Sequence, residues 1–293
     1  MPSAHSQIVT CPRAVRRVGI LTHPRVPETG TLAADLVRRF AALGVAAEVA
    51  SSADPRPLQA HLGSLDCLIT LGGDGSIVRA ARAIAGYDVP ILGVNLGQLG
   101  FLAELQPSQL EGRLEALARG EYRVEERRLL SAELTTQEGC RDGFLGLNDA
   151  VVARGEKVRA IAVAVWVDGQ LFTTYRADGV IVSTATGSTA YSLAVGGPIL
   201  APTLDCLSVI PVAPHLVPTR ALVVSGTSAI RLQVAEGHRA VLSIDGQIDR
   251  SLAGGDAVDV TLSPGRVGLV RFGPPADFYG TLFRRLRWAT HNR

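Results

Sequence analysis

Apolar and polar positions alternate in two different ways along this chain, and the change falls near Glu121. Before it, short apolar runs are separated by stretches with helical spacing. Helices are predicted over residues 31–43, stopped by Gly44, and over residues 108–119. The apolar runs are predicted to be buried strands: residues 18–22, 46–50, 67–71 and 90–94. This alternation predicts a Rossmann-like α/β domain with a parallel sheet, which binds ligands at the carboxyl ends of its strands.

After Glu121 the helical period largely disappears and strand-like runs follow one another closely. The hairpin signals Asp168-Gly169 and Asp245-Gly246 lie among them. The predicted strands are residues 129–135, 147–153, 160–167, 170–175, 180–184, 207–212, 221–224, 230–234, 240–244, 258–262 and 267–272. We therefore expect an all-β, sandwich-like domain. A last amphipathic stretch, residues 278–290, is predicted to be a helix that returns to the first domain.

These patterns predict four segments. Residues 1–14 read as a flexible leader, 15–120 as the α/β domain, 121–275 as the all-β domain, and 276–293 as a C-terminal segment that docks on the first domain. A ligand site between two such domains is a common arrangement.

Composition excludes some classes of function but does not identify one. A hydrophobic fraction of 47% supports a large core, and a net charge of +2 gives no reason to expect nucleic acid or a membrane as a partner. Lys157 is the only lysine and lies outside any Gly-Lys-Ser/Thr string, so the chain has no Walker A loop. The four cysteines have no paired spacing, which favours a reducing cytoplasm over a disulfide framework or a zinc site. No apolar run approaches the ~18 residues of a membrane span.

The first candidate site is the string Gly72-Gly73-Asp74-Gly75-Ser76. It follows a predicted strand and opens a predicted helix, so its backbone amides can face an anion such as phosphate. Asp74 is the single acid at the strand tip. Gly-Gly-Asp-Gly is also ordinary turn chemistry, and this string alone leaves both interpretations open.

The second half carries two further candidates. Asn148-Asp149 precedes an apolar run and offers acceptors for an adenine edge or a ribose hydroxyl, although a plain Asx turn is the simpler explanation of this pair alone. Five hydroxyl residues then crowd around Gly187 within residues 183–189, and Tyr191 supplies a flat face for a ring. A flexible Ser/Thr linker would not normally include such an aromatic residue. By contrast, Asp-Gly-Gln occurs twice, at residues 168–170 and 245–247, and a hairpin explains either copy.

Taken together, these motifs resemble those of the NAD kinase family over nearly the whole chain. Their order is Gly72 to Ser76, Asn148-Asp149, the long run from Asp178-Gly179 to Gly197-Pro198, and Asp245-Gly246-Gln247. Lipid kinases of the diacylglycerol and sphingosine type share the first motif. The long third motif is far more specific. Ser76 stands where the family often has Thr, and Asp149 where it often has Glu.

The resemblance implies transfer of the γ-phosphoryl group of ATP to the 2′-hydroxyl of the adenosine ribose of NAD, giving NADP. It implies that Asp74 is the catalytic base and that the all-β domain binds NAD. The implied NAD-binding residues are Asp74, Gly75, Arg79, Asn148, Asp149, Arg159, Arg176, Asp178, Thr186, Thr189, Ala190, Tyr191, Ser192, Leu193, Ala194 and Gln247. Arg159 is expected to come from a neighbouring subunit or loop, and no metal ligand is assigned.

The resemblance also implies a divalent cation, Mg²⁺ or Mn²⁺, with ATP as donor, and a cytoplasmic homodimer or homotetramer. Two alternatives stay open on the sequence alone. One is a lipid kinase that shares the glycine loop, and the other is a non-catalytic sensor that binds NAD or NADP.

Overall fold

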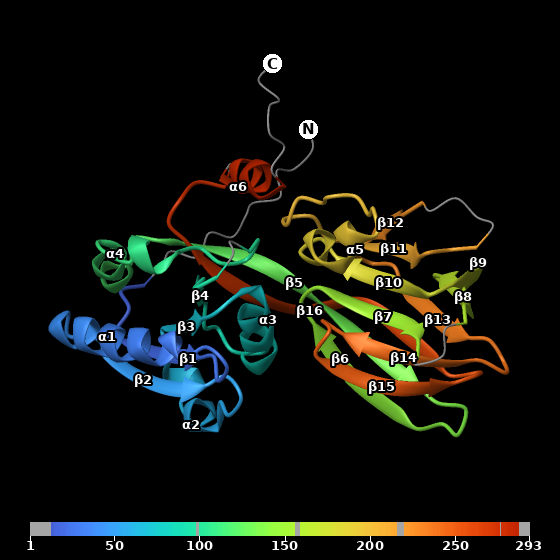
Figure 1. Ribbon diagram of the computed structural model, residues 1–293, viewed down its shortest axis with the longest axis horizontal. Helices are drawn as coiled ribbons and strands as arrows, with labels where there is room; N and C mark the ends of the chain where they lie inside the picture. Colours follow the sequence, from blue (N-terminus) through green and yellow to red (C-terminus); the bar gives the residue numbers. More distant parts are fainter. Residues whose placement is uncertain (1–12, 98–99, 156–158, 216–219, 276, 287–293) are drawn as a thin grey trace, which may run out of the picture. The chain divides into compact units, whose positions relative to one another are not determined.

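The computed structural model describes residues 13–97, 100–155, 159–215, 220–275 and 277–286. It divides into two compact units, one of residues 1–126 with 267–293 and one of residues 127–266. The chain passes from the first unit to the second within strand β5 (Arg123–Thr135) and returns within β16 (Ala257–Arg271) (Figure 1). Most of the predicted leader, residues 1–12, lies outside the described residues.

The first unit is built on a parallel sheet with strand order β2-β1-β3-β4, and the end of β16 lies beside β4. Its strands are β1 (Arg17–Thr22), β2 (Ala46–Ser51), β3 (Cys67–Leu71) and β4 (Ile91–Val94). All residues of β3 and β4 are buried, as is typical of a parallel sheet that is covered on both faces.

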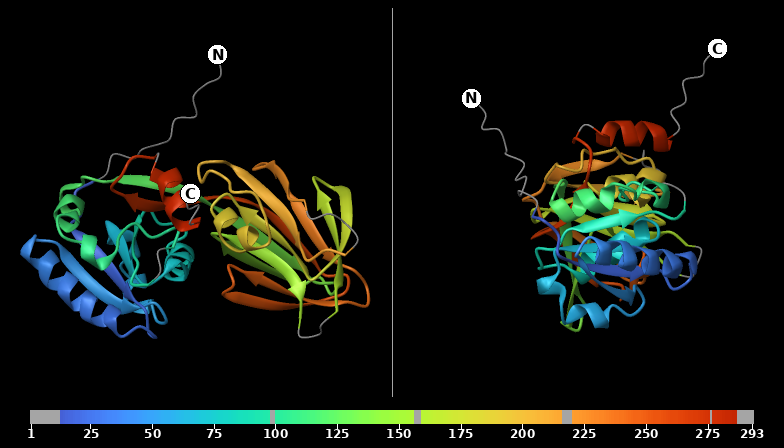
Figure 2. Two further views of the ribbon diagram at one scale, coloured as in Figure 1. Left: turned by 45° about the horizontal axis from the view of Figure 1, so that its top comes forward. Right: turned by 90° about the vertical axis from the view of Figure 1, so that its left-hand side faces the viewer.

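Helices cover both faces of this sheet (Figure 2). On one face, α1 (Glu28–Ala42) and α4 (Arg113–Arg119) share a core with β1, β3 and β4. On the other lie α2 (Arg56–Gln59) and α3 (Asp74–Ala83), where Ile77 packs on Gly93 of β4. Short 3₁₀ turns occur at η1 (Leu62–Ser64) and η2 (Pro107–Gln109).

The predicted helix over residues 108–119 was wrong in its first turn. Residues Pro107–Gln109 form the 3₁₀ turn η2, capped reciprocally by Gln106 and Gln109. Gly112 then takes a φ of 73°, a left-handed conformation that interrupts helical geometry, and α4 begins at Arg113.

The second unit is a sandwich of two antiparallel sheets. One is six-stranded, with order β12-β11-β10-β7-β14-β15; in the other, β16, β13, β8 and β9 are neighbours, and β5 pairs with β16 and β6. The strands are β6 (Arg141–Gly146), β7 (Asp149–Arg154), β8 (Ile161–Val167), β9 (Gln170–Ala177), β10 (Gly179–Thr184), β11 (Cys206–Val212), β12 (Leu222–Ser225), β13 (Ile230–Val234), β14 (Arg239–Ile244) and β15 (Ile248–Ala253). Inward residues such as Val152 and Val182 of one sheet, and Val163 and Leu232 of the other, form one buried core.

The predicted fold class is therefore confirmed, including the C-terminal helix. Helix α6 (Asp277–Leu286) belongs to the first unit and buries Leu282, while the end of the predicted helix, residues 287–290, lies outside the described residues. The unit boundaries at 126 and 267 are a finding of the structure.

Three details of the strand prediction were wrong. Strands β6 and β15 were not predicted, because both are mostly exposed and lack an apolar run. Residues 258–262 and 267–272 were predicted as separate strands around Pro264-Gly265, yet β16 runs through them. Gly265 donates its N–H to Ser263 Oγ (3.1 Å), so the strand tolerates this irregular point without a turn.

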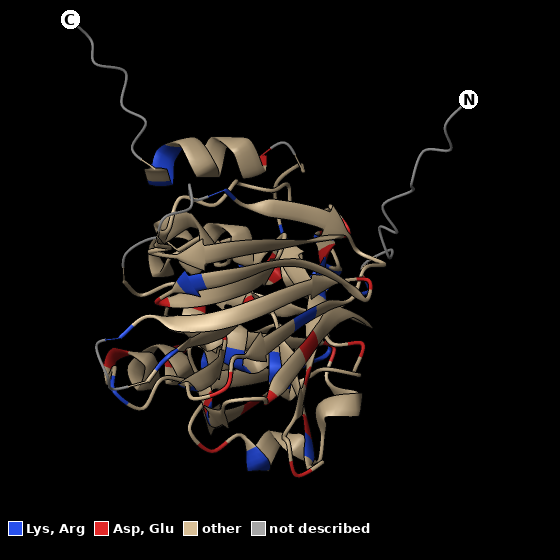
Figure 3. Ribbon diagram, turned by 90° about the vertical axis from the view of Figure 1, so that its right-hand side faces the viewer, with Lys and Arg blue, Asp and Glu red and all other residues tan. Residues whose placement is uncertain are grey.

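Charged residues of both signs are interspersed along the ribbon (Figure 3), in keeping with the small net charge. Across the part of the chain that the structure describes, no helix is both long and apolar enough to cross a membrane.

Candidate active site

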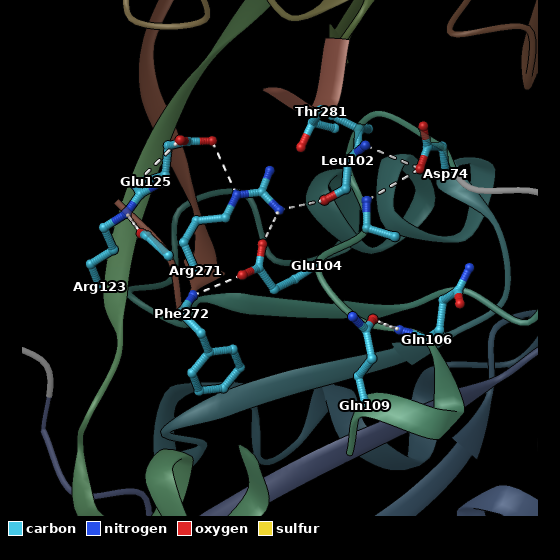
Figure 4. A network of polar contacts seen from close by, with 12 residues as sticks. Asp74, Leu102, Glu104, Gln106, Gln109, Arg123, Glu125, Arg271, Phe272 and Thr281 are labelled. Atoms are coloured by element: carbon cyan, nitrogen blue, oxygen red, sulfur yellow. Dashed lines mark hydrogen bonds and ion pairs between the residues drawn. The ribbon is translucent and has the colours of Figure 1, made fainter. Parts of the chain in front are cut away.

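Asp74 is the first residue of α3, directly after the extended Gly73. Its carboxylate accepts backbone N–H hydrogen bonds from three consecutive residues: Phe101 to Oδ2 (2.5 Å), and Leu102 and Ala103 to Oδ1 (3.1 and 3.3 Å). Figure 4 shows the contact between Asp74 and Leu102. The strand–turn–helix prediction for this string was correct. The loop that binds the acid was not anticipated.

Two glycines make this arrangement possible. Gly72 has a φ of 151°, and a Cβ there would lie 2.4 Å from Ser76 Oγ. A Cβ on Gly100 would lie 2.0 Å from Asp74 Oδ1, so only glycine lets the loop approach the carboxylate this closely. Gly100 is thus a site residue that our sequence analysis missed. Its signal was the glycine-containing run that follows β4.

Arg271 supports the loop from the side opposite Asp74. It is 8% exposed, and its Nη1 donates to the Leu102 carbonyl oxygen (2.8 Å) and to Glu104 Oε2 (3.1 Å). Its Nε donates to Glu125 Oε1 (3.2 Å) (Figure 4). The backbone of Leu102 is therefore held on both sides, its N–H by Asp74 and its C=O by Arg271.

The other predicted residues of the first unit, Gly75 and Arg79, are both in α3 and exposed. Arg79 lies more than one turn beyond Asp74 along the same helix.

In the second unit, the Asn148-Asp149 turn is held by a second aspartate. Asp245 accepts backbone N–H bonds from Leu147 at Oδ2 (3.0 Å), and from Asn148 and Asp149 at Oδ1 (2.7 and 3.1 Å). Its own N–H donates to the Asp149 carbonyl oxygen (3.0 Å). Sequence analysis interpreted Asp245 as a hairpin residue and missed this contact, which spans about 97 positions of the chain.

Asp149 is itself 4% exposed. Burial, and secondly the negative charge of Asp245, raise the pKa of Asp149 to about 7. Near neutral pH this carboxyl group can therefore act as a hydrogen-bond donor or as an acceptor.

The hydroxyl-rich run packs directly against the same turn. Thr184 Oγ1 donates to the Leu147 carbonyl oxygen (2.7 Å), and the Thr184 N–H donates to that of Asn148 (2.9 Å). A Cβ on Gly187 would lie 2.0 Å from the Asn148 oxygen, so glycine is required there for close backbone approach.

Beyond Thr184 the chain forms the 3₁₀ turn η3 (Gly187–Thr189) and the short helix α5 (Tyr191–Ala194). These elements contain the predicted residues Thr189, Tyr191, Ser192, Leu193 and Ala194, with Thr186 and Ala190 beside them. Tyr191 is 45% exposed, whereas Thr186 and Ser192 are buried. The Ser192 hydroxyl has no hydrogen-bond partner within the described chain.

The structure separates the predicted residues of the second unit into two groups at opposite ends of β7 and β10. At one end, Ser183 of β10 pairs with Asp149; at the other, Gly179 pairs with Ala153. The first end carries Asn148, Asp149, Thr186 and Gln247; the second carries Arg159, Arg176 and Asp178. Strand β10 is six residues long, so its ends lie roughly 17 Å apart at 3.3 Å per residue. At the second end, Asp178 pairs with Arg154 (3.0 Å) and Arg159 is exposed.

Models of two protein families match the N-terminal and the C-terminal part of the chain. Residues 30–122 match the ATP-NAD kinase N-terminal domain, and residues 147–272 match the ATP-NAD kinase C-terminal domain. These matches place the chain, with its glycine-flanked acid at the start of a helix, among phosphotransferases.

Similar proteins identify the family. An NAD kinase of Dehalococcoides mccartyi (strain CBDB1) is 40% identical over 273 residues, which are 93% of this chain and 96% of that protein. An NAD kinase of Heliobacterium modesticaldum is 42% identical over 82% of this chain and 83% of its own. The chain belongs to the NAD kinase family, which confirms the resemblance found in its motifs.

Solved structures agree. The crystal structure of an NAD kinase from Archaeoglobus fulgidus in complex with ATP has a TM-score of 0.73 and 25% identity, over 93% of this chain and 100% of that one. The yeast NADH kinase complexed with NADH has a TM-score of 0.86 at 24% identity, over 96% and 90%, and supports the fold.

Proposed function

We propose that this chain transfers the γ-phosphoryl group of ATP to the 2′-hydroxyl of the adenosine ribose of NAD, giving NADP and ADP. The observation that carries the proposal is the oriented carboxylate of Asp74 on a glycine turn. Phosphoryl transfer depends mainly on positioning and on charge stabilisation, and this turn supplies positioning.

Asp74 is proposed as the base that takes the proton of the ribose 2′-hydroxyl. The oxygen of that hydroxyl then attacks the γ-phosphorus of ATP, and ADP leaves. A carboxylate has about four acceptor positions, two on each oxygen. Oδ1 already accepts two amides and Oδ2 accepts one, so Oδ2 retains a position for the hydroxyl proton. A positioned base contributes about 10²- to 10⁴-fold to the rate.

The second unit is proposed to hold the dinucleotide. Asn148 and Asp149 would bind the adenosine part, because their turn is rigidly held and the pKa of Asp149 lets it donate or accept near pH 7. Thr186 and residues 189–194 would line the dinucleotide, with the exposed Tyr191 ring as a stacking face, and Gln247 would complete this end. Gly75 and Arg79 would face the ligand from α3.

The donor is proposed to be ATP with Mg²⁺ or Mn²⁺. Among the described residues, no group of three or more His, Cys, Asp or Glu side chains could hold a metal ion. Mg²⁺ is commonly bound by one or two carboxylates together with substrate phosphates. The ATP phosphates would supply most of the ligands in that pattern, and the cation would neutralise phosphate charge.

A homodimer or homotetramer is proposed, because Arg159, Arg176 and Asp178 lie one strand length away from Asn148. From that end these residues would face the nicotinamide half of the dinucleotide, with Arg159 reaching a neighbouring subunit's ligand. We assign the α/β domain to residues 15–120, the NAD-binding domain to 121–275 and a docking segment to 276–293. A cytoplasmic location follows the family and the unpaired cysteines.

The test is a coupled assay of NADP formation with purified protein, ATP, Mg²⁺ and NAD. Wild-type protein is expected to make NADP, and Asp74→Asn is expected to lower kcat about 10²- to 10⁴-fold. The exposed Asp88→Asn in the same unit is the matched control and should keep the wild-type rate. Thermal unfolding checks that both variants fold.

Failure of wild-type protein to phosphorylate NAD with either ATP or polyphosphate would contradict the proposal. Phosphorylation of a diacylglycerol or sphingosine substrate instead would identify a lipid kinase. Calorimetric binding of NAD without turnover would identify a sensor.

A further inference from the structure

Helix α6 ends in two consecutive arginines with different surroundings. The last turn of the helix, blue in Figure 3, contains Arg284 and Arg285. Arg284 is exposed, and its Nη2 donates to Thr281 Oγ1 (3.1 Å) one turn earlier. Arg285 turns inward, and its guanidinium carbon lies 4.9 Å from the centre of the Phe101 ring.

Arg285 has buried donors without an acceptor. Its Nε and Nη1 are buried, and neither has a hydrogen-bond partner in the described chain. Arg285 as a whole is half-buried. Arg271, a fully buried arginine beside this loop, is by contrast bound to Glu104, Glu125 and a carbonyl oxygen. A buried cation without an acceptor costs free energy, and stacking on an aromatic ring returns only about 0.5–2 kcal/mol.

Burial lowers the pKa of Arg285 to about 10, and the negative charge of Asp74 acts in the opposite direction. The side chain therefore stays cationic at neutral pH. Asp74 does not satisfy it either, because no ion pair joins these two described residues and the Asp74 carboxylate binds backbone amides instead.

Phe101 connects the unpaired cation to the proposed base. Its backbone N–H binds Asp74 Oδ2, while its ring lies under the Arg285 guanidinium. The start of α3, whose free amides and helix dipole favour an anion, begins at the same Asp74. A cation and a helix N-terminus thus meet at one loop in the first unit, and a phosphate oxygen is the acceptor that suits both.

We propose that Arg285 binds a phosphate group of a substrate beside Asp74. The ligand is a polyphosphate chain, either the triphosphate of ATP or the pyrophosphate of the dinucleotide. This inference rests on the proposed function, because it assigns Arg285 to a substrate of that reaction. Its test measures ligand binding and does not require turnover.

The experiment compares Arg285→Met, which keeps an unbranched apolar stem and removes the charge, with the matched control Arg284→Met on the same turn. Isothermal titration calorimetry measures the Kd of Mg²⁺-tripolyphosphate, of Mg²⁺-ATP and of NAD for each full-length protein. Loss of a charge-assisted hydrogen bond weakens binding about 10- to 100-fold, which is expected for Arg285→Met. Arg284→Met should stay within about twofold of wild type, as expected for an exposed side chain.

Thermal unfolding without ligand separates this role from a structural one. Because Arg285 lacks an acceptor, Arg285→Met should unfold at the wild-type temperature or above it. Weaker tripolyphosphate and ATP binding with unchanged NAD binding would assign Arg285 to the donor, and the reverse would assign it to the dinucleotide.

Wild-type affinity of Arg285→Met for all three ligands overturns the inference, as does a fall in unfolding temperature without a change in Kd. If wild-type protein makes no NADP yet binds tripolyphosphate through Arg285, the proposed function fails and this inference stands. If it makes NADP and Arg285→Met binds normally, the inference alone fails.

Discussion

In each unit, an aspartate accepts hydrogen bonds from three consecutive backbone amides. The two contacts have opposite roles, because a different partner is held in place in each. Asp74 binds residues 101–103, and Asp245 binds residues 147–149. In the first unit the loop orients the acid, because the acid is the group proposed to react. In the second unit the acid orients the loop, because the ligand-binding residues Asn148 and Asp149 are in the loop itself.

This difference predicts different dependencies. The loop at Asp74 has its own support from Arg271, which holds the Leu102 carbonyl oxygen. The turn at Asp245 is held by that aspartate and by Thr184. Substitutions in the supporting residues should therefore affect the two sites to different degrees.

The largest effect on stability is expected for Arg271→Met. It would leave Glu104 without its buried cation and Glu125 with only Arg123, and breaking a buried ion pair costs about 3–5 kcal/mol. The free energy of unfolding, measured in urea, should fall by that order. The exposed pair Arg231–Asp259 is the control, and Arg231→Met should cost less than about 1 kcal/mol. Similar losses in the two variants would show that burial of Arg271 contributes little.

A smaller, pH-dependent effect is expected at Asp149. Its pKa is about 7 in the folded protein against an ordinary value of 3.8, so between these values the folded state binds more protons than the unfolded state. Stability should therefore fall as pH rises from about 4 to 7 and level off above, by a few kcal/mol in all.

Asp149→Asn removes this titration. Its unfolding temperature should be close to that of wild type near pH 4 and exceed it by several degrees near pH 8. A difference between the two proteins that stays constant across this pH range would contradict the raised pKa.

The smallest effects on the free energy of unfolding are expected for substitutions in the two Asp-Gly-Gln turns. Asp245 uses both carboxylate oxygens, so Asp245→Asn would place an amide NH₂ against the Leu147 N–H and should cost about 2 kcal/mol. Within the described residues, the Asp168 carboxylate accepts only the Ala229 N–H, at Oδ1 (2.9 Å), and Asp168→Asn can keep that bond. Its cost should be within about 0.5 kcal/mol.

Urea unfolding of both variants measures these costs, and the KM for NAD should rise only in Asp245→Asn. Equal stability and equal KM in the two variants would mean that Asp245 is an ordinary hairpin residue.

The same two turns show what the sequence could predict. Asp168 and Asp245 both have positive φ and both close hairpins, as the local Asp-Gly signal indicated. Only Asp245 meets amides from residues about 97 positions away, and an identical local string cannot indicate that. The turn at Asp74 was predictable because its strand, glycines and helix are contiguous. Its partner Phe101, and Arg271 that supports the loop of Phe101, come close to it only in the folded protein.

Solvent exposure explains the features that the sequence did not predict. Strands β6 and β15 have little apolar surface to bury, so no periodic pattern marks them. Arg285 was not recognised because an arginine near the end of an amphipathic helix usually faces solvent. Its inward orientation depends on Phe101, in a loop that was not assigned a role.

The return of β16 to the first unit also has a consequence for synthesis of the protein. Residues 127–266, the whole second unit, leave the ribosome as one continuous piece and can fold in order. Translation of the first unit begins earlier, but this unit also needs Arg271 and α6, which are translated after residue 266. The unit that starts first is completed last, and a nascent chain that stops at residue 266 would lack the support of the Asp74 loop.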